Sequence, residues 1–165
     1  MDNSLKRSPS LTSIVLGSIV VEAVMAILLV KIQPGPSLKA WYGELGFSAL
    51  TMDVVSLAVG TWLGMKLASR FDMGHYFLAQ MAGVVVVQVV HDVIFGTLVL
   101  PHLPKSTPVK LFRTYAAEKG SRILVDDALL MMAAVVGTYV LQSLKKEEAS
   151  VIALTSMYVS CLLLL

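Results

Sequence analysis

The chain has 165 residues and a net charge of +2; 56% of its residues are hydrophobic and only 15% are charged. Soluble globular domains carry about 25% charged residues, so charge cannot cover this surface and a lipid environment is indicated. The small net charge argues against a nucleic-acid partner, and the single cysteine, Cys161, excludes an internal disulfide and a cysteine-rich metal site.

The first apolar segment runs over about residues 11–30, after Lys6 and Arg7. It is longer than the apolar core of about 7–15 residues in a cleavable signal, and it holds Glu22 at its middle, so we expect a retained span. A helix needs about 20 apolar residues to cross the hydrocarbon core, and the segments over about 45–67 and 76–100 also reach that length. Pro101 then ends the third segment, because proline cannot continue a helix.

A short amphipathic helix is predicted over about residues 108–119, between the third and fourth spans. Pro108 suits a first helical position and Gly120 a carboxyl-terminal stop. Val109 and Phe112 share an apolar face, with the basic residues largely elsewhere, which is typical of a helix in the membrane interface; an ordinary polar connector is the alternative. Aromatic residues near span ends are interpreted as further interface anchors: Trp41, Tyr42, Trp62 and Tyr76.

The fourth span is expected over about residues 123–144 and the fifth over about 149–165. The fifth is the shortest, about 25 Å at 1.5 Å per residue, and its end on four leucines leaves a truncated chain open. The whole pattern predicts an all-α, polytopic integral membrane bundle. We expect a polar segment over 1–10 and a single transmembrane helical domain over 11–165.

Lysine and arginine counts leave the orientation and the host membrane open. With five spans the termini lie on opposite sides, and the basic residues divide almost equally, which the positive-inside rule cannot resolve. One side would hold Lys6, Arg7, Lys66, Arg70, Lys145 and Lys146, and the other Lys31, Lys39, Lys105, Lys110, Arg113, Lys119 and Arg122.

Carboxylates inside the apolar segments are the most informative feature for function. Glu22 lies near the middle of the first span, Asp53 in the first half of the second, and His91 and Asp92 past the middle of the third. A charged side chain at the bilayer centre costs at least about 2.5–3.5 kcal/mol on insertion scales. Such groups therefore face protein or water, pair with another group, or become neutral.

Helical spacing predicts that these groups face one another. Residues three or four apart share a helix face, so Asp53 belongs to a stripe of small residues and Gln88 lies along one side with His91 and Asp92. We therefore predict an inward polar cluster of Glu22, Asp53, Gln88, His91 and Asp92. The stripe on the second span comprises Gly46, Ala49, Asp53, Ser56, Gly60 and Gly64. Close helix packing alone also explains such stripes, so a structural role for the cluster stays open.

Asp126 and Asp127 open the fourth span and form a secondary group with Arg122. Arg122 and Asp126 are four residues apart, which predicts a local ion pair. A carboxylate in the first turn also suits the helix dipole. A structural role is favoured for this group.

No lysine or arginine lies deep in a span, and the candidate cations are Arg122 at the edge of the fourth span and a protonated His91, so some of the deep carboxylates must be protonated or hold a cation. Carboxylates close to a histidine can exchange protons near neutral pH. We therefore predict proton or small-cation transport or channel activity, with the lipid bilayer and a proton or small cation as partners.

Two other classes of function stay open. Small-residue stripes and short loops also suit a non-catalytic structural or assembly subunit, as a homo-oligomer or in a larger membrane complex. A small lipid-modifying enzyme of the isomerase type would use His91 and a carboxylate as acid and base. The signatures of intramembrane aspartyl proteases, di-metal carboxylate proteins and retinal proteins are absent, so no cofactor and no metal site are expected.

Overall fold

The computed structural model describes residues 9–32, 35–73 and 76–164, and every regular element in those ranges is helical. Five of the helices are long and apolar enough to cross a membrane, which confirms the predicted helical membrane bundle. The elements are α1 Leu11–Ile32, α2 Pro36–Leu45, α3 Phe47–Arg70, α4 Phe77–Ile94, η2 Phe95–Val99, η3 Leu100–His102, α5 Thr107–Lys119, α6 Arg122–Gln142 and α7 Lys146–Leu164.

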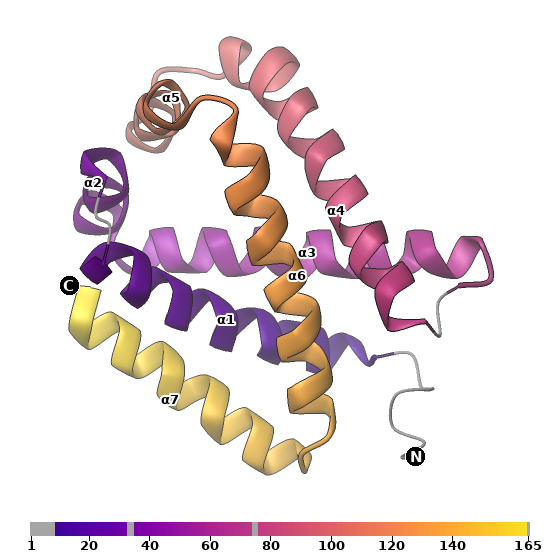
Figure 1. Cartoon of the computed structure of the whole chain (residues 1–165). Helices are drawn as coiled ribbons and strands as arrows, with labels where there is room; N and C mark the ends of the chain where they lie inside the picture. The colour runs from indigo at the N-terminus through magenta and orange to yellow at the C-terminus, as the bar shows by residue number, and fades with distance from the viewer. Residues whose placement is uncertain (1–8, 33–34, 74–75, 165) are drawn as a thin grey trace.

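Helix α1 occupies the middle of the bundle (Figure 1). It packs against α3, α6 and α7, while α4 packs against α3 and α6. Helix α7 makes most of its contacts with α1 and lies at the edge of the bundle. A polar side chain on α1 is therefore surrounded by protein on several sides.

The two shorter helices, α2 and α5, lie side by side at one end of the bundle (Figure 1). At this end α1 and α4 finish and α3 and α6 begin. Leu111 on α5 is buried, and Gly120 ends the helix with a φ of 56°. The predicted short helix over 108–119 is present, and it lies across the ends of the spans.

The predicted span over about residues 45–67 is present as α3, and the turn at Gly46 sets its first residue at Phe47. Gly46 adopts φ 55° and ψ −129°, a conformation that residues with a Cβ rarely adopt, and it separates α2 from α3. Helix α2, which the sequence analysis missed, turns away from the α3 axis and covers the end of the bundle. Gly46 is therefore a hinge between two helices rather than a member of a packing stripe.

The remaining predicted boundaries agree with the structure to within a few residues. The third span continues beyond Leu100 through η2 and η3 to His102, and the fifth begins earlier, at Lys146. Residues 1–8, with the predicted basic pair Lys6 and Arg7, lie outside the described residues.

Glycines allow the closest helix contacts in the bundle. A Cβ added at Gly17 of α1 would lie 2.6 Å from the backbone nitrogen of Thr138 on α6. A Cβ at Gly64 of α3 would collide with the backbone of Val84 on α4. Small residues let membrane helices approach in this way, although Ser56 of the predicted stripe is exposed.

Replacing Gly17 by alanine should destabilise the bundle by about 1–3 kcal/mol, because the added methyl group meets backbone that cannot move aside. Gly43→Ala is the matched control, since nothing lies within 4 Å of a Cβ at that position of α2. Thermal unfolding in detergent micelles should show a lower Tm for Gly17→Ala alone. Equal Tm values for the two variants would contradict the α1–α6 packing.

Candidate functional site

The side chain of Tyr42 joins two of the deep carboxylates. Its hydroxyl lies 2.6 Å from Oε1 of Glu22 on α1 and 3.2 Å from Oδ2 of Asp53 on α3. The indole Nε1 of Trp41 donates to the same Asp53 oxygen at 2.8 Å. A phenol carries a single proton, so Tyr42 either shares this proton between the two carboxylates or donates to one and accepts a hydrogen bond from the other when that carboxyl group is protonated.

Trp41 and Tyr42 are buried within the protein, with 8% and 5% of their surfaces exposed. The interpretation of these two residues as membrane-interface anchors is therefore wrong. Helix α2 packs against α3 and α5, so the side chains of both Trp41 and Tyr42 contact other helices. Burial, reinforced by the charges of Glu22 and Asp53, raises the pKa of the Tyr42 hydroxyl and keeps it protonated.

Asp92 forms a second polar group on α4. Its Oδ1 accepts from Gln88 Nε2 at 2.7 Å and lies 3.1 Å from Nδ1 of His91. Its other oxygen, Oδ2, is buried and has no hydrogen-bond partner among the described residues. The His91 side chain is 54% exposed, and Val93 and Ile94, which follow on α4, are exposed as well. His91 thus lies at the rim of the group rather than inside it.

Asp127 of α6 interacts electrostatically with both polar groups, the one around Tyr42 and the one around Asp92. Its carboxylate is close enough to interact electrostatically with Asp53 and Asp92, and it also acts on Glu22. Four spans therefore direct a carboxylate toward one half of the bundle. We call Glu22, Asp53, Asp92 and Asp127 the carboxylate cluster.

Asp126 belongs to a separate surface group. Its oxygens lie 3.6 Å from Lys119 Nζ and 3.6 Å from Arg122 Nε. The predicted ion pair with Arg122 is present, and Lys119 of α5 adds a second cation. The neighbouring acids of α6 thus differ: Asp126 pairs with surface cations, while Asp127 makes no ion pair within the described ranges.

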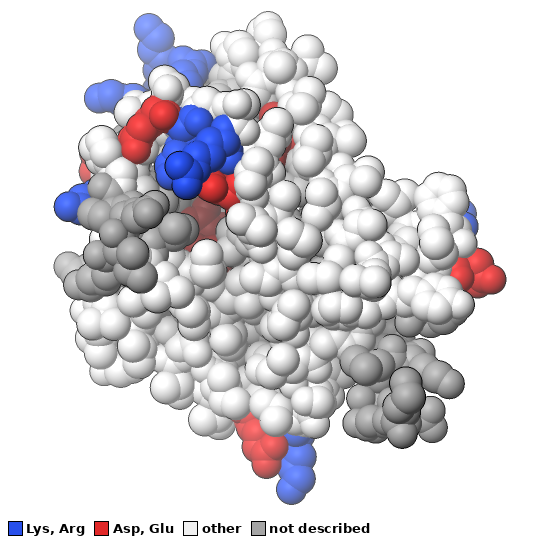
Figure 2. Space-filling view, viewed as in Figure 1, with Lys and Arg blue, Asp and Glu red and all other residues white. Residues whose placement is uncertain are grey.

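A row of aromatic rings runs over the carboxylate cluster. Trp41 packs edge-on against Phe112 of α5, with ring centroids 4.8 Å apart. Phe112 in turn contacts Phe95 at 5.5 Å, and Phe95 stacks on His91 at 5.6 Å. Helix α5 thus links the partner of Asp53 to the partner of Asp92. In Figure 2, Asp and Glu atoms lie recessed beside Lys and Arg side chains at this end of the molecule.

Tyr115 of α5 faces the same carboxylates. Burial is the main cause that raises the pKa of its hydroxyl, and the charges of Asp127 and Asp126 raise it further. The phenol therefore stays protonated at the edge of the cluster. Sequence reasoning missed Trp41, Tyr42 and Tyr115 as site residues; two hydrogen-bonding aromatics directly before an acid-bearing span were the available signal.

The described residues hold no group of three or more His, Cys, Asp and Glu side chains arranged to bind a metal ion. No family model, curated protein or solved structure matches this chain. The site is therefore described from its own contacts.

Helix α5 also fixes the position of α2. Oε2 of Glu118 accepts a hydrogen bond from the backbone nitrogen of Ser37 at 3.0 Å. A carboxylate at the start of α2 accepts from an N–H of the first turn that has no partner within the helix, and the positive end of the helix dipole stabilises its negative charge. A Cβ at Gly35 would meet the Glu118 carboxylate, so this carboxylate lies directly against the start of α2. The hydrogen bonds from Ser37 lower the pKa of Glu118.

Replacing Glu118 by alanine should loosen α2 and lower the hydrogen-exchange protection of residues 36–45. A lowered folded-state pKa stabilises the contact above the ordinary glutamate pKa, and the gain is lost as pH falls through the folded-state value. Acidification should therefore bring the wild type toward the variant. Glu44→Ala, on α2 itself, is the control; equal protection in both variants would refute this role of Glu118.

Replacing Tyr42 by phenylalanine should cost about 1–3 kcal/mol of stability, because two buried carboxyl groups lose a shared hydrogen-bond partner. Tyr158→Phe on the exposed face of α7 removes the same hydroxyl and should change stability by less than about 0.5 kcal/mol. Thermal unfolding in detergent micelles measures both. Similar losses in the two variants would show that Tyr42 does not hold the cluster together.

Proposed function

We propose that the carboxylate cluster binds and passes on protons, and that the protein conducts protons, or a small cation, across its membrane. The observation that carries the proposal is the contact of one phenol with two carboxylates, Glu22 and Asp53, at the junction of three helices. A phenol between two carboxyl groups can relay a proton by accepting one from the first group as it donates its own to the second, so the hydroxyl stays protonated.

The charge balance supports this proposal. Glu22 is 2% exposed, and no lysine or arginine among the described residues forms an ion pair with any member of the carboxylate cluster. Several uncompensated negative charges in a nonpolar interior are very costly. The cluster must therefore hold protons or a cation, and small changes around it can make it release them.

Buried polar side chains continue from the cluster toward the opposite end of the bundle. Ser18 and Thr61 are fully buried, and their hydroxyls have no partner among the described residues. Further along, the Tyr139 hydroxyl donates to Oε1 of Gln80 at 3.0 Å. At the other end, the exposed His91 lies beside Asp92. Buried polar groups thus occur on α1, α3, α4 and α6, and a proton path requires such groups in the interior.

A structural role is the second candidate. The contacts of Glu22, Asp53, Trp41 and Tyr42 tie three helices together, and buried hydrogen-bonded networks also serve to specify one arrangement of helices. In that case the protein acts as an assembly subunit. The two candidates differ in one measurable property, which is proton flux.

Purified protein in liposomes that enclose a pH-sensitive dye should dissipate an imposed proton gradient faster than protein-free liposomes. Asp53→Asn and Glu22→Gln should reduce the flux to the background of empty liposomes, because amides cannot take up and release the proton. Asp92→Asn tests the second polar group in the same way. Exchanging sodium for potassium at constant pH separates proton flux from cation flux.

Glu147→Gln is the control, since this acid lies in the first turn of α7, away from the cluster. Its flux should equal that of the wild type. A wild type that shows no flux of protons or alkali cations, in correctly folded form, would favour the structural role. Flux that survives all three cluster substitutions would place the path elsewhere in the protein.

A further inference from the structure

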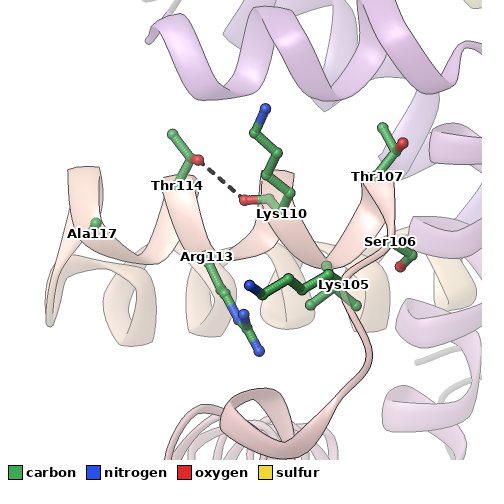
Figure 3. A pocket seen from close by; sticks show the side chains of 8 residues that line it. Lys105, Ser106, Thr107, Lys110, Arg113, Thr114 and Ala117 are labelled. Atoms are coloured by element: carbon green, nitrogen blue, oxygen red, sulfur yellow. Dashed lines mark hydrogen bonds between the residues drawn. The ribbon is translucent and has the colours of Figure 1, made fainter.

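A basic hollow lies outside the carboxylate cluster, along α5 and the two residues before it (Figure 3). It has a volume of about 690 Å³, within the range of small-ligand sites. Its lining combines cations and hydroxyl groups with two apolar side chains, Val109 and Ala117. The polar lining residues are Lys105, Ser106, Thr107, Lys110, Arg113 and Thr114.

The cations of the hollow are not neutralised by the protein. No ion pair of Lys105, Lys110 or Arg113 occurs in the described ranges; the basic side chains paired there are those of Lys119, Arg122 and His91. Figure 3 shows Lys105 and Arg113 extending to the same side of α5 and Lys110 to the other. Two positive groups thus converge on one space, and a third adds to the potential around it.

Arg113 is held in place by the end of the third span. Its Nη2 lies 2.9 Å from the carbonyl oxygen of Leu100, 3.3 Å from that of Leu103 and 3.4 Å from that of Pro101. These bonds satisfy carbonyls where the helix has ended. A guanidinium has five N–H donors, so a group fixed through one nitrogen still offers donors to an anion, at a defined position.

The place of the hollow in the membrane indicates which anion it meets. The third span ends at His102 and the fourth begins at Arg122, so the segment between them lies where the chain leaves and re-enters the bilayer. Lipid phosphates are concentrated at this depth, and basic groups there attract anionic lipids. Val109 and Ala117 provide apolar surface for the part of a lipid next to its headgroup.

We propose that this hollow binds the phosphate of an anionic phospholipid headgroup. Lys105 and Arg113 contact the phosphate, and Lys110 contributes charge from the neighbouring turn. The proposal is independent of proton conduction, since none of these side chains belongs to the carboxylate cluster. Bound lipid would also fasten α5 to the end of the third span, because Arg113 already bonds to the carbonyls of Leu100 and Leu103.

Lipid binding can be measured on the full chain, purified in a neutral detergent, by native mass spectrometry during titration with phosphatidylglycerol or zwitterionic phosphatidylcholine. Phosphatidylglycerol should bind at least about tenfold more tightly, since each basic group near a membrane surface contributes roughly fivefold. The double variant Lys105→Ala and Lys110→Ala should abolish most of this preference. Both lysines are exposed, so the fold should survive, which circular dichroism checks.

Lys145→Ala with Lys146→Ala is the matched control, because it removes the same charge from the opposite end of the bundle. Its preference for phosphatidylglycerol should stay within about twofold of the wild type. Arg113→Lys, which keeps the charge but loses the planar fork, should also weaken binding.

Three results would overturn the proposal. In the first, the wild type binds phosphatidylglycerol and phosphatidylcholine equally. In the second, both double variants lose the preference for phosphatidylglycerol equally, which would indicate unspecific attraction. In the third, inorganic phosphate titrated alone binds as tightly as phosphatidylglycerol, and the hollow is then a site for a soluble phosphate. If inorganic phosphate displaces bound phosphatidylglycerol only at concentrations far above that of the lipid, the result would support a lipid site.

Discussion

The hydroxyl of Tyr42, set between Glu22 and Asp53, is the contact on which the rest of the structure depends. Two carboxyl groups on neighbouring spans repel each other when charged and lack partners when neutral, unless a donor lies between them. Helix α2 supplies that donor, and Trp41 supplies a second one to Asp53. The position of a helix outside the spans therefore decides how the interior of the bundle tolerates its acids.

Two features bring α2 to this position. The backbone of Gly46 permits a change of direction that residues with a Cβ rarely make, so α2 does not continue the axis of α3. Glu118 of α5 then accepts the backbone N–H of Ser37 and holds the opposite end of α2. With Phe112 packed against Trp41, the two short helices form one cover over the carboxylate cluster. The basic hollow lies on this cover, on the segment that carries Arg113.

The sequence predicts the spans well because length and hydropathy are local properties. It also predicts the helix before Gly120 and the ion pair of Arg122 with Asp126, which depend on spacing along one helix. Helix α2 was not predicted, because its 10 residues include Lys39 and Glu44 and do not form an apolar segment of span length. Trp41 and Tyr42 were taken for interface anchors, because their burial depends on contacts with α1, α3 and α5. Such tertiary contacts leave no periodic signal.

The arrangement of the short helices makes the two ends of the bundle different from each other. Both α2 and α5 lie at one end, and Asp53 and Asp127 belong to the second turns of α3 and α6, which begin there. Under the proposed conduction, a proton entering from that end would reach the acids after a short distance, whereas one from the far end would cross most of the bilayer. A membrane voltage changes the energy of a charge by about 2.3 kcal/mol per 100 mV over the full thickness. Most of that drop would fall on the longer half, so occupancy of the acids would respond to voltage as well as to pH.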